Sequence, residues 1–396
     1  MGHADSAIRA ALPLSQAMQF SDEQSLLLET ATAFCRDKSP IATVRQRMTT
    51  DAGFDRAVWD EMVALGWSGM AIPESFGGSG LTLAELATVT EPIGRHLLAT
   101  PLFSTQLFVQ AVLAGANPAQ QALWLPKLVS GAIGTVALFE QDGDWALDAI
   151  AASARNEGNS VVLAGDKILV GDALQADCFA VSVMLDGAPA LVIVPAADIG
   201  AARMRRETII DETRRSAALS LDGIRVPGSA LITGEAARKA LEAVRHAGLL
   251  LASAEAVGGI AGVLGVVLEY LNLRKTFGRK IGSYQSLKHT CADILIGLER
   301  SRSHVYHAAS LITEAAAGAD ISAIDIDVAL RMAKVETGDS FVFAGDRAVQ
   351  FHGGFGFTWE CDAQLYLRRA LWLQYAFGDA GHHRRKLADA LLSPVG

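Results

Sequence analysis

The spacing of apolar residues divides the chain into three parts. From Asp22 to about Ile133, apolar residues recur with a period near 3.6, as on one face of an α-helix, and loops at 72–80 and 115–118 interrupt the pattern. Ser21 followed by Gln24 has the form of a capping box, which predicts that a helix starts there. The first part is therefore expected to be helical.

The pattern changes near Gly134 to short runs of β-favouring residues. Turn residues such as Gly158 and Asn159 separate these runs, which are spaced roughly ten residues apart, as in a small all-β domain. The predicted strands cover 135–139, 161–163, 167–170, 178–184, 190–194 and 217–221. A β-barrel or sandwich is expected.

Helical periodicity returns from Glu235. Long segments at 235–273, 283–317 and 323–351, and two shorter ones after Trp359, are joined by brief loops, which is typical of an up-and-down antiparallel bundle. Asp320 or Ser322 is expected to cap the third segment. The predicted fold is mainly α with a central β-domain. The predicted domains are an N-terminal helical domain at 1–133, a β-domain at 134–232 and a C-terminal bundle at 233–396.

One segment is apolar enough to resemble a membrane span. Leu249 to Leu268 is nearly all apolar and about as long as a span requires, but Glu255 lies within it and glycines crowd its middle. We interpret it as a buried helix of the bundle, in which small residues allow close approach and Glu255 is a partnered polar residue.

The bulk chemistry excludes several classes of function. A net charge of −9 argues against a nucleic-acid partner, whose phosphates favour a basic surface. Cys35, Cys178, Cys291 and Cys361 form no CxxC pair, so neither a zinc site nor a redox dithiol is expected, and their scarcity favours a reducing compartment. No secretory pattern is evident at the N-terminus, and a cytoplasmic location without membrane contact is expected.

Two motifs offer groups that can hold a phosphate-bearing ligand. Residues 274–285 read RKTFGRKIGSYQ, in which Arg274 can fork onto phosphate oxygens, Phe277 can cover a flat ring, and Gln285 can both donate and accept hydrogen bonds. A helix C-terminus with dipole-compensating cations explains the same run equally well. Residues 350–360 read QFHGGFGFTWE, whose glycines allow close backbone approach, although a generic turn remains open. The second motif follows a helix and lacks GxGxxG spacing, which excludes a Rossmann nicotinamide site.

These runs resemble the RxxFGxxIxxxQ and QxxGGxGF signatures of the acyl-CoA dehydrogenase family, and the loop at 66–81 is similar to one in that family's N-terminal domain. The resemblance implies FAD between the β-domain and the bundle, with its adenosine and pyrophosphate half clamped by a neighbouring subunit. Carried over by motif, the clamping residues are Arg274, Phe277, Gln285, Gln350, Gly353 and Gly354. It also implies an acyl-CoA substrate, electron-transfer flavoprotein or a similar acceptor, and a dimer or tetramer of like or unlike chains.

The chain departs from the family pattern where the reaction takes place. The family reaction needs a carboxylate base near the substrate's α-carbon. Phe377 stands at the position of the usual glutamate, and Gly248 and Leu249 stand at the alternative position in the first bundle helix. In place of the Lys-x-Trp-Ile-Thr run that meets the flavin ring, the chain has Lys167 to Gly171, and 141–145 replaces the expected Ala-Gly-Ser loop.

Asp379, two residues beyond Phe377, is the candidate catalytic base, and the competing interpretation is that it caps the following helix. Two functional hypotheses follow. In the first, the chain is a dehydrogenase that uses Asp379. In the second, it is an FAD-clamping subunit of a heteromer whose partner supplies the base, as in bacterial two-gene enzymes that act on bulky acyl-CoA such as steroid side chains. A flavin-free helical scaffold is disfavoured because the clamp motifs are complete.

Overall fold

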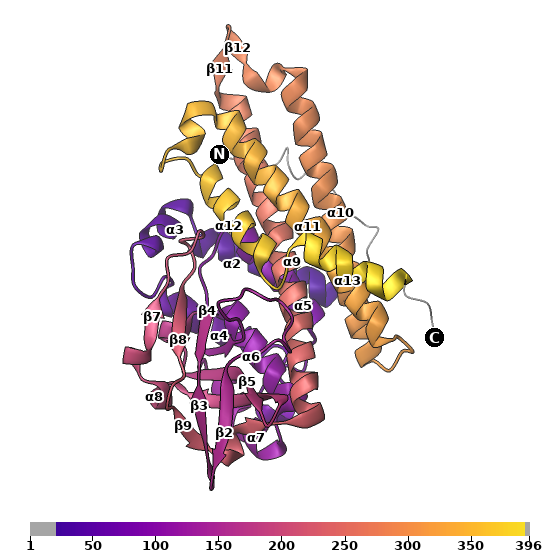
Figure 1. Ribbon diagram of the computed structural model, residues 1–396. Helices are drawn as coiled ribbons and strands as arrows, with labels where there is room; N and C mark the ends of the chain where they lie inside the picture. Colours follow the sequence, from indigo (N-terminus) through magenta and orange to yellow (C-terminus); the bar gives the residue numbers. More distant parts are fainter. Residues whose placement is uncertain (1–20, 393–396) are drawn as a thin grey trace.

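The computed structural model describes residues 21–392 and begins with a helical region (Figure 1). Its helices are α2 (Asp22–Lys38), α3 (Ile41–Met48), α4 (Arg56–Ala64), α5 (Leu83–Arg95), α6 (Leu102–Gly115) and α7 (Pro118–Val129), with the 3-10 turn η1 (Glu74–Phe76) before α5. The capping box at Ser21 and Gln24 is confirmed, with both of its reciprocal hydrogen bonds. The prediction that the N-terminus has no secretory signal concerns residues 1–20, which lie outside the described residues.

The middle region consists of short strands. They are β1 (Gly134–Ala137), β2 (Ser153–Glu157), β3 (Ser160–Ala164), β4 (Asp166–Gly171), β5 (Cys178–Leu185), β6 (Ala188–Pro195), β7 (Met204–Arg206), β8 (Ser216–Ser220), β9 (Arg225–Pro227) and β10 (Leu231–Ile232). One sheet has the order β10-β6-β5-β2-β3-β9, with β1 also pairing in parallel with β5, and a second sheet has the order β4-β8-β7. A bridge between Phe139 and Ile168 links the chain after β1 to β4.

The C-terminal region is a bundle of long helices. These are α9 (Gly234–Leu273), α10 (Gln285–Ala316), α11 (Ala323–His352), α12 (Ala363–Tyr375) and α13 (Ala380–Leu392), with the hairpin β11 (Lys275–Thr276) and β12 (Arg279–Lys280) before α10 and the 3-10 segment η6 (Gly353–Phe357) after α11. Ser322 caps α11, since its side chain accepts a hydrogen bond from the Asp325 amide. The predicted fold class, helices followed by a β region and a helical bundle, is confirmed.

Helix α9 is the element that connects the bundle to the rest of the chain. It is about 60 Å long and packs against α5, α6, α10, α11 and α12. Within residues 21–392 it is the one helix long and apolar enough to cross a membrane, but 78% of its most apolar stretch is buried. Glycines allow the close crossing with α5, because a Cβ added at Gly258 would overlap the Glu91 carbonyl oxygen and one at Gly94 would overlap that of Glu255. The interpretation of this segment as a buried bundle helix is confirmed.

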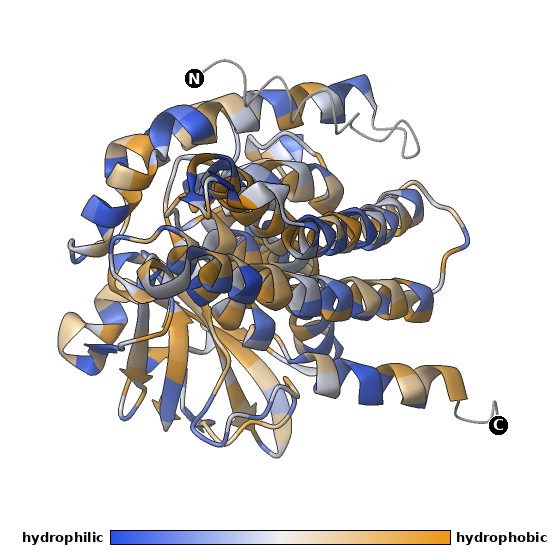
Figure 2. Cartoon of the chain, turned by 90° about the horizontal axis from the view of Figure 1, so that it is seen from above, coloured by the Kyte–Doolittle hydropathy of each residue, from blue (hydrophilic) through white to orange (hydrophobic). Residues whose placement is uncertain are grey.

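Burial follows hydropathy across the regions. In Figure 2 the strands of the β region are coloured mainly hydrophobic, whereas the outer helices of the bundle carry both hydrophilic and hydrophobic residues. The buried apolar residues extend from the N-terminal helices through the sheets into the bundle. The candidate site lies where these three regions meet.

Candidate active site and flavin clamp

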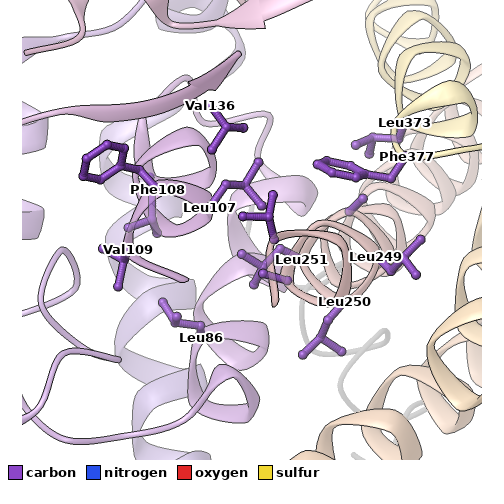
Figure 3. Packing of buried hydrophobic residues seen from close by; sticks show 14 of the residues in the cluster. Leu86, Leu107, Phe108, Val109, Val136, Leu249, Leu250, Leu251, Leu373 and Phe377 are labelled. Atoms are coloured by element: carbon purple, nitrogen blue, oxygen red, sulfur yellow. The ribbon is translucent and has the colours of Figure 1, made fainter. Parts of the chain in front are cut away.

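The two positions at which a catalytic base was sought lie in contact with each other. A Cβ added at Gly248 would lie 2.6 Å from both Cε2 and Cζ of Phe377, so the ring rests directly on the glycine of α9. Figure 3 shows Phe377 and Leu373 beside the α9 helix, with Leu107 of α6 on its other side. The ring therefore fills the space that a carboxylate from either position would use.

Two further aromatic rings complete this contact. Phe377 packs edge-on against Phe139 at a centroid distance of 5.6 Å and tilted against Phe103 at 6.5 Å. Its side chain is only 7% exposed although its backbone is left-handed, at φ 58°. Burial of the ring in this cluster outweighs the cost of that backbone conformation, which is of order 1–3 kcal/mol. The two positions that the resemblance predicts for a catalytic base are therefore part of an aromatic cluster.

Asp379 lies at the N-terminus of α13. Its Oδ1 accepts a hydrogen bond from the His382 amide at 2.7 Å, and its backbone carbonyl accepts one from the His383 amide. It does not border the cavity described below, although Phe377 does. The geometry is that of a helix cap. The catalytic role of Asp379 stays a prediction.

A cavity of about 260 Å³ adjoins the aromatic cluster. Its walls come from the N-terminal helices, the β region, α9 and α12. Apolar side chains on its border include Leu98, Leu102, Phe103, Leu107, Leu251, Leu373 and Phe377, and charged ones are Glu140, Asp172, Arg214, Arg215, Glu255 and Arg369. A mostly apolar hollow with a few polar groups is the ordinary form of a small-molecule site.

The charged wall of this cavity is a buried network centred on Arg369. Arg369 is 1% exposed and donates to Asp211, Glu255 and Thr213, while Arg214 donates to the other oxygen of Glu255. Burial alone would raise the pKa of Glu255, but the adjacent Arg214 and Arg369 outweigh that effect and lower it. The interpretation of Glu255 as a buried, partnered residue is confirmed.

The strand that would face a flavin ring offers no side-chain hydrogen-bonding group at the two family positions. Leu169 and Gly171 stand there, and the Gly171 carbonyl already accepts a hydrogen bond from Thr135 Oγ1 at 2.6 Å. Lys167 turns inward, where its Nζ donates to Glu140 Oε1 at 2.6 Å and to Ser182 Oγ at 2.9 Å. The amides of 151 and 152 also donate to Glu140, so this ion pair fixes the loop at 141–150.

The clamp motifs lie together at the opposite end of α9. Arg274 caps α9, and β11 and β12 form a hairpin whose turn, Phe277 and Gly278, has positive φ at both residues. The Phe277 ring is 91% exposed as a result. Tyr270 of α9 stacks on His352 of α11 at 4.0 Å, which places the start of η6 near the C-terminal end of α9.

The exposure of these six residues fits a ligand held at a subunit boundary. Arg274, Phe277, Gln285, Gln350, Gly353 and Gly354 are all exposed. Arg274 forms no ion pair with any residue in the described range, and a Cβ at Gly353 or Gly354 would meet nothing within 4 Å. A free guanidinium beside open backbone suits a pyrophosphate. The assignment of these six residues to FAD stays a prediction.

Comparison with known proteins decides the family. A model of the N-terminal domain of acyl-CoA dehydrogenases matches residues 21–132, and a model of the C-terminal domain matches residues 236–392. The chain belongs to the acyl-CoA dehydrogenase family. Members of this family bind FAD and are oxidoreductases.

Individual relatives agree with this. The acyl-CoA dehydrogenase IpdE2 of Mycolicibacterium smegmatis is 29% identical over 355 residues, covering 88% of this chain and 93% of that protein. The structure of the Tcur3481-Tcur3483 steroid acyl-CoA dehydrogenase, G363A variant, has a TM-score of 0.80 and 26% identity over 93% of this chain and 98% of that one. The ChsE4-ChsE5 complex of Mycobacterium tuberculosis has a TM-score of 0.85 at 24% identity, covering 96% of this chain and 99% of that one, which shows the shared fold.

Sequence reasoning missed three features of the site. It treated Phe377 and Gly248 as separate losses, although a large residue at one position and the smallest at the other is a signal of mutual packing. It did not identify Arg369 or Asp211, which come together from segments 158 residues apart. It also missed the stack of Trp145 on Tyr375, at 6.4 Å and 11°, and both residues border the cavity.

Proposed function

We propose that this chain is a subunit of an FAD-dependent acyl-CoA dehydrogenase that introduces an α,β double bond into an acyl-CoA, and that a homologous partner subunit supplies the catalytic base. The observation that carries the proposal is the Phe377 ring packed on Gly248. A phenyl ring cannot accept the α-proton, and it occupies the space from which a carboxylate would have to act.

The clamp residues have the role of holding cofactor for a neighbour. Arg274 and Gly248 are separated by about 40 Å along α9, so the exposed clamp and the cavity of one chain cannot serve the same reacting centre. Arg274 would fork onto the pyrophosphate, Phe277 would cover an aromatic ring, and the backbone amides near Gly353 and Gly354 would receive anionic oxygens. FAD, when bound, supplies the acceptor for the hydride that leaves the β-carbon.

The proposed subunit composition follows from the roles given to this chain and its partner. A chain that only donates its clamp needs an unlike partner with an intact base and ring contacts. We therefore favour a heterotetramer or heterodimer over a homo-oligomer, with electron-transfer flavoprotein or a similar acceptor reoxidising the flavin. The ChsE4-ChsE5 complex, whose name gives two components and one chain of which has this fold, supports such an arrangement.

The alternative is a self-sufficient dehydrogenase in which Asp379 is the base. Asp379 is the carboxylate nearest in sequence to Phe377, and it would have to release the His382 amide and turn toward the cavity. The geometry favours the partner hypothesis, because the Asp379 carboxylate already accepts the hydrogen bond from the His382 amide that caps the start of α13.

Steady-state turnover of an acyl-CoA with a dye acceptor separates the two hypotheses. We expect the chain produced alone to turn over at least 10²-fold more slowly than the complex with its partner, since a general base contributes about 10²–10⁴-fold. Asp379→Asn, compared with the exposed control Asp389→Asn, should leave the activity of the complex unchanged. Turnover by the isolated chain that Asp379→Asn abolishes would refute the partner hypothesis and establish Asp379 as the base.

A further inference from the structure

The Phe377 turn, residues 374–378, joins α12 to α13 and determines where the Phe377 ring packs. The backbone angle φ is positive at both Phe377 and Gly378, at 58° and 112°. A left-handed backbone is unfavourable for a bulky residue such as Phe377, so the surrounding structure has to hold it. The amides of 376 and 378 donate back to α12, but the last carbonyls of a helix have no partner within the helix. A donor from another element is therefore needed.

Lys334 of α11 is this donor. Its Nζ donates to the carbonyl oxygens of Gln374 and Gly378, each at 3.0 Å. One of these carbonyls precedes Phe377 in the chain and the other follows it, so a single ammonium group ties both sides of the turn to α11. A cation at this place also faces the negative end of the α12 dipole, which favours the contact.

Lys334 is a buried cation without a carboxylate partner. It is 3% exposed, and none of the ion pairs within residues 21–392 includes it. Asp379 and Asp339 raise its pKa from beyond ion-pair distance, while Asp379 caps α13 and Asp339 pairs with Arg384. Burial is the larger effect and lowers the pKa of Lys334 to about 7. Its charge therefore changes near neutral pH.

The other basic groups beside Lys334 keep their charge above pH 7. On α11, Arg331 donates to Asp327, and its Nη1 lies 3.1 Å from Nδ1 of His383 on α13. Burial and the charges of Lys334 and Arg331 lower the pKa of His383 to about 3, so this ring is neutral. Burial also lowers the pKa of His382 from its ordinary 6.5. Above pH 7, Lys334 is the basic group of this cluster that titrates.

The protonation of Lys334 is linked to the conformation of the turn. If the turn opened, water would reach Lys334 and its pKa would return toward the ordinary 10.5. Between pH 7 and 10, opening would therefore take up one proton, and the open state would become about tenfold less populated for each unit rise in pH. Below pH 7 both states carry the proton, so the ratio would no longer change.

We propose that Lys334 is the positioning residue that holds Phe377 against Gly248, and that through this contact the Phe377 turn opens more readily as the pH falls toward 7. Residues 375–377 also border the cavity, so opening would change one of its walls. The inference rests on the proposed function in one respect, that Phe377 occupies the position of a base.

Hydrogen exchange followed by mass spectrometry measures the opening of the turn in the assembled protein with its FAD. Peptides that contain the amides of Ala376 and Gly378 report on it, and their protection factors are corrected for the intrinsic exchange rate at each pH. We expect protection of the turn to rise about tenfold from pH 7.5 to 8.5, and protection of α5 to stay constant. A protection factor of the turn that does not change with pH would overturn the proposal.

Three variants separate positioning from a general structural role. Lys334→Met removes both hydrogen bonds, so protection of the turn should fall about tenfold or more and lose its pH dependence. Lys334→Gln, which keeps a donor that cannot titrate, should restore part of the protection without its pH dependence. The control is Thr337→Val on the same helix, because Thr337 is equally buried and its hydroxyl bonds only to α11 carbonyls. It should leave the turn unchanged.

Two outcomes of these measurements would refute the role of Lys334. One is wild-type protection of the turn in Lys334→Met, and the other is an equal loss of protection in the turn and in α5. None of the measurements depends on turnover. Failure of the partner hypothesis would therefore show in the activity of the isolated chain, and failure of the Lys334 contact would show in hydrogen exchange alone.

Discussion

The two ends of α9 differ in what they keep of the family pattern. At the C-terminal end, the hairpin of β11 and β12 and the segment η6 carry complete motifs, and Arg274, Phe277 and Gln285 are exposed. Near Gly248, the motif positions carry a glycine and a phenyl ring that pack on each other, and the surrounding residues are buried. The exposed motifs at the C-terminal end of α9 are complete, whereas apolar packing fills the region around Gly248 where a catalytic base was expected.

This difference is the basis for the proposed division of roles between the two ends. An exposed guanidinium and an exposed phenyl ring contribute little to the stability of their own chain, and under the proposed function they contact the FAD of a neighbouring subunit. The packing of Phe377, by contrast, contributes to the core of this chain.

The largest effect is expected at the buried end. Arg369→Met leaves Asp211 and Glu255 facing each other with only Arg214 between them, and should lower the free energy of unfolding by about 3–5 kcal/mol. Urea denaturation measures it. The control is Arg384→Met, whose exposed pair with Asp339 is expected to matter by less than about 1 kcal/mol. Equal effects of the two variants would show that the network does not stabilise the fold.

The exposed end should respond in affinity and not in stability. Arg274→Ala should weaken FAD binding by roughly 1.5–3 kcal/mol in the assembled protein, the range for hydrogen bonds to a charged group. Arg274→Lys should recover only part of this, because an ammonium lacks the planar fork. Equilibrium dialysis of FAD measures both variants. Full flavin occupancy in the alanine variant would show that Arg274 is only a cation at the end of a helix. We also expect the wild-type protein to bind FMN more weakly than FAD.

A smaller effect tests the contact between the two vacant base positions. Gly248→Ala places a methyl group within 2.6 Å of the Phe377 ring, and overpacking of this kind should destabilise the protein by about 1–3 kcal/mol. Phe377→Leu in the same chain should relieve the clash, so the double variant should be more stable than the sum of the single effects predicts. Thermal or urea unfolding of the four proteins gives the coupling, and strict additivity would contradict the contact.

Most of the fold could be predicted because its signals are local. Ser21 and Gln24 determine the first helix start, Ser322 starts α11, and the apolar period identifies the long bundle helices. The strands that were not predicted are β2, β7, β9, β10, β11 and β12. The sequence of β2, SARNE, is polar and has only one buried residue, so its pairing with β3 and β5 rather than its own pattern defines it as a strand.

The candidate site divides in the same way. The clamp could be proposed from sequence because each motif is a continuous run whose residues stay together at one end of α9. The buried network could not, because Arg369, Asp211 and Glu255 belong to three separate segments that meet only in the folded chain. The sequence showed that Phe377 occupies the position expected for the glutamate base. Its contact with Gly248 could not be predicted, because that contact depends on how α12 lies against α9.

The composition of the assembly purified from its native host tests the central claim most directly. Native mass spectrometry combined with flavin quantification gives the identity of the chains and the number of FAD molecules per chain. If this chain clamps the cofactor of a partner and its own ring site is closed by Phe377, a second homologous polypeptide should be present in equal amount, with one FAD for each pair of unlike chains. A homo-oligomer of this chain alone, with one FAD per chain and full acyl-CoA dehydrogenase turnover, would contradict the account.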